Sequence, residues 1–281
     1  MVASVMCFAI MDICIKWLNY YPFGEVFFAR FFFGLIPILL IIPKDKWSNF
    51  YKTKRPGLHA FRAICGSVAF VCIFFGLRHL PLADVVSLTF GGPIFVTIAS
   101  IMFLSEKVGI RRWLAVFLGF IGMILIIQPA FIELNYYYLS PILFCIFFSG
   151  VAISVRALSK TEPNYRIAFY FTVLCTFIGL CTLPYGWIMP TTKDLFLFII
   201  MGLCGSVANL LLTQSYRLAE ASLVTPIKYL SLVFAITFGF TIWGEIPKPL
   251  MLAGALLVIL SSLIIFIREK KLKKEIVAPR S

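Results

Sequence analysis

Charged residues are scarce in this chain. Only 13% of its 281 residues are Asp, Glu, Lys or Arg, about half the share of a typical soluble domain. Apolar residues make up 61%, and 30 residues are Phe. A soluble fold of this length needs a polar surface that this composition does not supply, whereas lipid accepts an apolar one. The composition therefore predicts an all-α membrane protein.

Residues for metal and phosphate chemistry are also few. The only histidines are His59 and His79, and neither H-E-x-x-H nor G-x-x-x-x-G-K-[ST] occurs. The eight cysteines all lie in apolar stretches and form no C-x-x-C pair, so neither a zinc site nor a secreted disulfide framework is expected. We expect no metal, no cofactor, no ATPase and no enzyme activity.

Long polar segments are missing as well, because the longest connection between apolar stretches is 44–57. A helix that crosses a bilayer needs about 20 apolar residues. The sequence predicts ten such helices, at 1–18, 22–43, 58–78, 83–104, 111–128, 139–157, 166–186, 194–213, 222–243 and 249–267.

The positive charge, +13 in total, is distributed unevenly along the chain. With a cytoplasmic N-terminus, 18 of the 25 Lys and Arg residues fall in cytoplasmic loops, at Arg268 or in the basic tail 269–281, and four fall on the opposite side. This asymmetry predicts a multi-pass protein with both termini in the cytoplasm. The surroundings are then membrane lipids, and nucleic acid is excluded as a partner because no basic face exists outside the membrane.

The two halves of the chain resemble each other. Residues 77–108 can be laid over 216–247 at an offset of 139, which matches Glu106 with Glu245. The repeats are predicted at 1–130 and 139–268, with five helices each. Because five is odd, the second repeat enters the membrane from the other side, and such inverted repeats are typical of secondary transporters.

Several segments carry a family resemblance, and they occur in the expected order in both halves: FAIMDICIKWL (8–18), PFGEVFFARFFFG (22–34), GLRHLPLADVVSLTFGGPIFV (76–96), LSEKVGIRRWLAVFLGFIGMILIIQP (104–129) and YRLAEASLVTPIKYLSLVFAITFGFTIWGEIP (216–247). The sequence resembles the EamA branch of the drug/metabolite transporter superfamily. The resemblance implies ten helices as two inverted five-helix repeats, in the inner (cytoplasmic) membrane of the cell. It also implies ATP-independent movement of a small metabolite.

The segment TPIKYLSLV (225–233) is similar to bacterial S-adenosylmethionine uptake carriers, and amino-acid and metabolite exporters share the branch. We therefore expect a secondary transporter for S-adenosylmethionine or an amino-acid-like compound, working by alternating access. Two other hypotheses are a receptor or accessory subunit that binds without flux, and an intramembrane enzyme, for which no catalytic pattern is present.

Charges inside a membrane are energetically expensive, so each needs a reason. Lys228, which follows Pro226, is the first candidate for binding an anionic group of a substrate, with Tyr229 beside it. Asp12 and Lys16 share a helix face, and we favour an ion pair between them over a pair that lines a cavity. Arg30 lies deep in its helix and needs a partner, for which Asp12 is a candidate.

The remaining candidates are polar residues and helix breaks. Glu25 is a proton-coupling candidate or a favourable charge at a helix start, and Asn209 and Gln214 either contact substrate or bond between helices. Arg62 is expected to extend to cytoplasmic headgroups. The fourth and ninth predicted helices are expected to be interrupted at Gly91, Gly92, Pro93 and Pro226. We expect these interruptions to expose backbone groups to a cavity. The alternative is that they are kinks required by helix packing.

Overall fold

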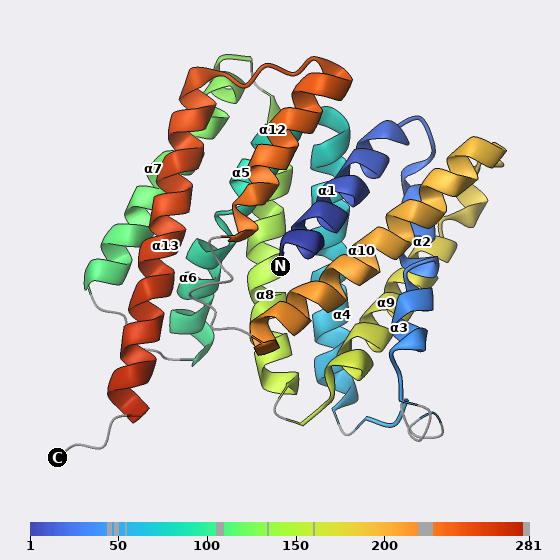
Figure 1. Ribbon diagram of the computed structural model, residues 1–281, viewed down its shortest axis with the longest axis horizontal. Coiled ribbons are helices and arrows are strands. Elements are labelled where there is room, and N and C mark those ends of the chain that lie inside the picture. Colours follow the sequence, from blue (N-terminus) through green and yellow to red (C-terminus); the bar gives the residue numbers. More distant parts are fainter. Residues whose placement is uncertain are drawn as a thin grey trace.

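The structure is a computed structural model, and it describes residues 1–281 except 44–46, 48–50, 54, 105–109, 134, 160, 219–226 and 278–281. Every element among the described residues is helical (Figure 1). They are α1 Val2–Trp17, α2 Phe23–Phe32, α3 Leu35–Leu40, α4 Pro56–His79, α5 Leu82–Thr89, α6 Gly92–Leu104, α7 Ile110–Glu133, η2 Tyr136–Tyr138, α8 Leu139–Leu158, α9 Asn164–Leu180, η3 Leu183–Tyr185, α10 Thr192–Leu218, α12 Leu230–Trp243 and α13 Pro249–Val277.

Five helical stretches are long and apolar enough to cross a membrane: Phe23–Leu40, Pro56–His79, Leu82–Ala99, Tyr136–Val155 and Thr192–Leu212. Four shorter apolar helices accompany them in the described part of the chain. The protein is therefore an all-helical membrane protein.

Two of the long stretches are interrupted. The chain leaves the helix between α5 and α6 at Phe90 and Gly91, where Gly91 and Pro93 had indicated a break. It also leaves the helix between α2 and α3, at Phe33 and Gly34. Pro37 explains this second interruption, since a proline has no N–H to donate to the carbonyl four residues earlier.

The seventh predicted helix, 166–186, ends earlier than expected. α9 stops at Leu180, and the 3-10 turn Leu183–Tyr185 follows. Pro184 cannot continue the hydrogen-bond ladder, and Gly186 adopts a φ of 82°, which side chains other than glycine rarely accept. The connection that leads to α10 is therefore longer than the sequence had indicated.

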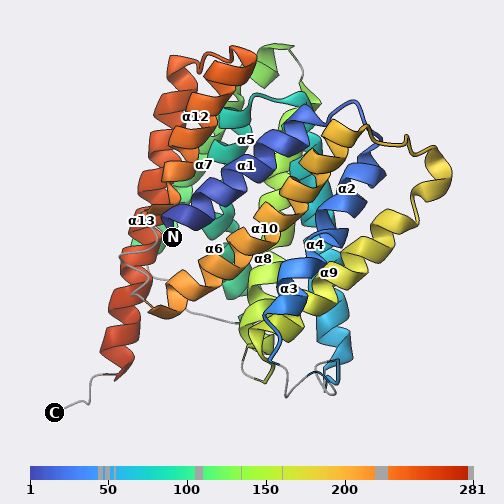
Figure 2. The ribbon, with the colours of Figure 1, turned by 45° about the vertical axis from the view of Figure 1, so that its right-hand side comes forward.

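The helices pack in pairs from opposite halves of the chain. α4 packs on α8, α1 on α10, α2 on α9, and α5 on α12. α7 and α13, the last helices of the two halves, lie side by side at one edge of the molecule in both views (Figures 1 and 2). The buried apolar cluster runs between these pairs, with Ile15, Val26, Phe74 and Val85 almost fully buried.

Small residues let α7 and α13 approach closely. A β-carbon on Gly254 would lie 2.6 Å from the carbonyl oxygen of Gly122, and one on Gly122 would lie 2.7 Å from that of Gly254. The hydroxyl of Ser261 donates to the carbonyl of Ala115 at 2.6 Å. The two backbones are thus in direct contact, the arrangement that small residues permit in membrane helices.

Candidate functional site

Lys16 forms an ion pair, but not with Asp12 as the sequence had suggested. The residue is 8% exposed, and its ammonium pairs with the carboxylate of Glu245, just after the end of α12. The ammonium also donates to the carbonyl of Leu80 at 2.9 Å and lies 5.2 Å from the centre of the Trp243 ring. The prediction of an Asp12–Lys16 pair was wrong because the α1 face that holds Lys16 meets another helix, which one-helix spacing cannot reveal.

Glu245 is held in place by the turn that ends α12. Gly244 has a φ of 67°, and the N–H groups of Gly244 and Glu245 return to the carbonyls of Phe240 and Gly239. The second carboxylate oxygen of Glu245 accepts the N–H of Leu82 at 2.8 Å, at the start of α5. This carboxylate therefore joins α1, α5 and the turn after α12.

A second set of bonds ties the α1–α2 turn to the segment around the start of α10. Tyr20 and Tyr21 donate to the two carboxylate oxygens of Asp194, at 2.7 and 3.0 Å. Burial raises the pKa of Tyr21 above its ordinary value, so its phenol stays protonated and donates. The buried carboxylate of Glu25 accepts the N–H of Ile188 at 3.0 Å. Glu25 thus acts as a hydrogen-bond acceptor between distant parts of the chain.

Arg30 is one of the largest fully buried side chains of the protein, 2% exposed. Its Nε donates to the sulfur of Met11 at 3.0 Å. Asp12 lies close enough to interact with it electrostatically, although no ion pair within 4 Å joins them. Gly205 makes the space for the guanidinium group, since a β-carbon there would lie 2.2 Å from Cζ of Arg30.

Arg62 does not extend to a headgroup region, which corrects the expectation from the sequence. Its Nε and Nη1 atoms are buried, and the guanidinium group lies 3.7 Å from the centre of the Phe171 ring on α9. Gly66, one turn later on α4, leaves room for it. The side chain therefore turns inward, because an aromatic face in the core is within its reach.

Lys228 and Tyr229 lie just before α12. The Lys228 side chain is exposed, yet its ammonium acts electrostatically on Cys145 of α8, which is fully buried. No acid among the described residues pairs with Lys228.

The interruption between α5 and α6 is packed by side chains of other helices. The thiol of Cys145 lies 3.4 Å from the carbonyl of Leu88, and the hydroxyl of Ser262 donates to the carbonyl of Phe90 at 2.9 Å. The Tyr229 ring meets the Phe90 ring edge-on at 5.1 Å. Two carbonyls at the break are therefore occupied by protein groups, and Tyr229 packs against the break.

The remaining predicted site residues belong to α10, to the break before α6 and to a segment outside the described residues. Asn209 on α10 is exposed, and its amide donates to the carbonyl of Gly205 at 3.1 Å, within its own helix. Gln214 is exposed further along α10. Gly92 begins α6 beside the break. Pro226 lies outside the described residues.

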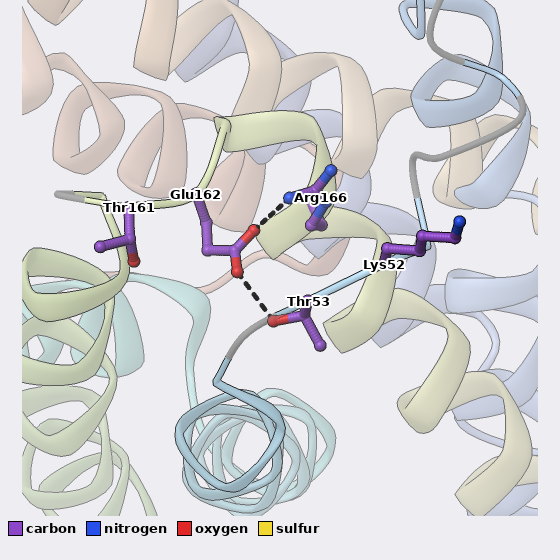
Figure 3. Close-up of a pocket in the computed structure, with 5 residues that line it drawn as sticks. All are labelled: Lys52, Thr53, Thr161, Glu162 and Arg166. Atoms are coloured by element: carbon purple, nitrogen blue, oxygen red, sulfur yellow. Dashed lines mark hydrogen bonds and ion pairs between the residues drawn. The ribbon is translucent and has the colours of Figure 1, made fainter.

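A cavity of about 350 Å³ opens where α4 and α9 begin, lined by Lys52, Thr53, Thr161, Glu162 and Arg166. Figure 3 shows Glu162 between its two partners, Thr53 at 2.8 Å and Arg166 at 2.5 Å. Glu162 is therefore paired with a cation within the cavity wall, and none of the site residues predicted from the sequence lines this cavity.

Sequence reasoning missed several of these groups. Asp84, 8% exposed, accepts a hydrogen bond from Tyr138 at 2.5 Å and was not singled out, although an acid in an apolar run was a usable signal. Glu245 was noted in the sequence only as the counterpart of Glu106 in the internal repeat. No group of three His, Cys, Asp or Glu residues suited to a metal ion occurs within the described part of the chain.

Comparison with known protein families decides the class. The EamA-like transporter family matches residues 1–128 and again residues 135–267. The chain belongs to the EamA-like transporter family. As an EamA protein it is a transporter rather than an enzyme.

Three curated relatives of this EamA protein are named as transporters or exporters. It is 29% identical to an S-adenosylmethionine uptake transporter of Rickettsia bellii, over 88% of this chain and 84% of the relative. It is 25% identical to the pseudopaline exporter CntI of Pseudomonas aeruginosa, over 85% and 84%. A riboflavin transporter of Rhizobium johnstonii is 27% identical over 98% and 91%. These names support a small-metabolite transporter.

One solved crystal structure shares the fold. It covers 96% of this chain and 96% of its own, with a TM-score of 0.63 and 11% sequence identity. At that identity the likeness concerns the arrangement of helices alone.

Proposed function

We propose that this EamA protein moves a small metabolite with a carboxylate group, S-adenosylmethionine or an amino-acid-like compound, by alternating access and without ATP. The observation that carries the proposal is Lys228, an accessible ammonium without an acid partner among the described residues, beside an interrupted helix. A charged side chain without a partner inside a membrane protein is energetically unfavourable. A substrate carboxylate would supply the missing counter-charge.

The names of the relatives support this substrate class. S-adenosylmethionine, the substrate named for the Rickettsia relative, carries an amino-acid carboxylate. The site residues of the proposal are Lys228 and Tyr229, which lie next to each other just before α12. Glu25 is proposed as the proton-coupling residue, because it is a buried carboxylate that bridges the two halves through Ile188.

We infer an architecture of ten transmembrane helices in two inverted repeats, 1–130 and 139–268. Support comes from the two ranges that match the same family. The helix pairing supports it too, since α1 on α10 corresponds to α8 on α4 when the halves are exchanged. Exchange of α7 with α13 returns the same pair. Both termini would lie in the cytoplasm and the protein in the inner membrane, as the Lys and Arg distribution indicates.

Uptake into proteoliposomes tests the function. Purified protein is reconstituted, a proton or sodium gradient is imposed, and accumulation of radiolabelled S-adenosylmethionine and methionine is measured without nucleotide. We expect uptake that follows the gradient and survives the absence of ATP. Uptake only with added ATP and clamped gradients would refute a secondary transporter, and binding without flux would favour a receptor or accessory subunit.

A further inference from the structure

Arg62 is a cation without a hydrogen-bonding partner among the described residues. No protein acceptor lies within reach of its guanidinium group, and its Nε and Nη1 atoms are shielded from solvent. The group stacks on the Phe171 ring at 3.7 Å. A guanidinium carries five N–H donors, so a ring face satisfies its charge only in part.

Arg30 approaches the same place from α2. Its guanidinium group lies 5.1 Å from the Phe31 ring and 5.8 Å from the Phe70 ring. Both rings contact Phe171, with centroids 5.3 and 5.8 Å apart. The two cations therefore flank one aromatic cluster, which α2, α4 and α9 build where they run side by side (Figures 1 and 2).

One thiol interacts with both cations. Cys175 on α9 is fully buried, and both Arg30 and Arg62 act on it electrostatically. Among the described residues, Asp12 is the one acid that acts on either cation, and it forms no ion pair with Arg30. The two guanidinium groups thus border one aromatic cluster with little negative charge to balance them.

We propose that Arg30 and Arg62 form a carboxylate-binding site between α2, α4 and α9, separate from Lys228. Guanidinium groups match a carboxylate with paired donors, and the aromatic cluster keeps water from competing. This proposal rests on the proposed function in one respect, namely that the carboxylate belongs to the transported metabolite. The site itself stands if the protein binds the same group without moving it.

Stability measurements separate a binding role from a structural one. Arg78 is the matched control, because it lies on the same helix, stacks on Phe23 at 5.4 Å, and donates to the carbonyl of Tyr21 at 2.8 Å. Arg62→Gln removes a charge that has no partner, so the melting temperature in neutral detergent should stay equal or rise. Arg78→Gln breaks native hydrogen bonds and should lower it. A loss for Arg62→Gln as large as for Arg78→Gln would overturn the proposal.

Ligand-induced stabilisation tests the site directly. Sodium acetate and S-adenosylmethionine are added at matched ionic strength, with chloride as the reference. Both should raise the melting temperature of the wild type and of Arg78→Gln. Arg62→Gln should weaken the apparent affinity about 10- to 150-fold, and Arg62→Lys should fall between, because it keeps the charge but loses the planar stack.

The source of the anion is tested in the same assay. Phosphatidylglycerol is added in place of the carboxylates, and inorganic phosphate serves as the free-anion comparison. No stabilisation of the wild type by either carboxylate probe, or stabilisation by phosphatidylglycerol alone, would overturn the carboxylate site. If S-adenosylmethionine binds through Arg62 but is not taken up by proteoliposomes, the proposed transport fails while this inference holds.

Discussion

The ion pair between Lys16 and Glu245 offers a quantitative test of how the two halves hold together. Exposed pairs contribute about 0–1 kcal/mol, and removing one partner of a fully buried pair costs about 3–5 kcal/mol. Here the side chains of Lys16 and Glu245 are 10% and 21% exposed. Glu245→Gln keeps the shape and an acceptor for Leu82, so we expect a loss of about 2–3 kcal/mol in the free energy of unfolding.

A double-mutant cycle isolates the pair. Lys16→Met, Glu245→Gln and the double variant are unfolded reversibly in mixed micelles, and each free energy is compared with the wild type. The double variant leaves no stranded charge, so the coupling energy should be about 1.5–3 kcal/mol. Lys193→Met is the control, because Lys193 is exposed and should change stability by less than about 0.5 kcal/mol. A coupling energy below about 0.5 kcal/mol would refute the reasoning.

Three further predictions follow from individual residues. Lys228→Met should leave the protein folded and weaken substrate affinity about 10- to 150-fold, with partial retention in Lys228→Arg; unchanged uptake kinetics would exclude the role. Gly254→Ala should lower stability by about 1–3 kcal/mol, because the new β-carbon would meet a backbone oxygen at 2.6 Å, whereas Gly57→Ala, with nothing within 4 Å, should be neutral in the same thermal assay. Reporters fused after Lys52, Lys160 and the C-terminus should report cytoplasm, and those near Asn135 and Lys193 the other side; a cytoplasmic signal at Asn135 would contradict inverted repeats.

Much of the fold could be predicted from the sequence, because it depends on features local to the chain. Apolar length indicates where helices cross a membrane, and Gly91 with Pro93 indicated the break before α6. Gly34 and Pro37 held the same kind of signal for the break before α3. The family could be predicted because its segments recur in order in both halves.

The interior contacts could not be predicted in the same way. Helical spacing says which residues share a face, but not which helix covers that face. Lys16 therefore appeared to belong with Asp12, although its partner Glu245 lies 229 residues away in the sequence. Arg62 appeared to belong to a headgroup region, since only the packed structure places the Phe171 ring within its reach.

The backbone contact between Gly122 and Gly254 bears on how closely the two half-chains approach each other. α7 ends the first half and α13 ends the second, and they meet without intervening side chains. A side chain added at either glycine would meet main-chain atoms of the other helix, so the separation of the two half-chains is fixed at this point by their backbones.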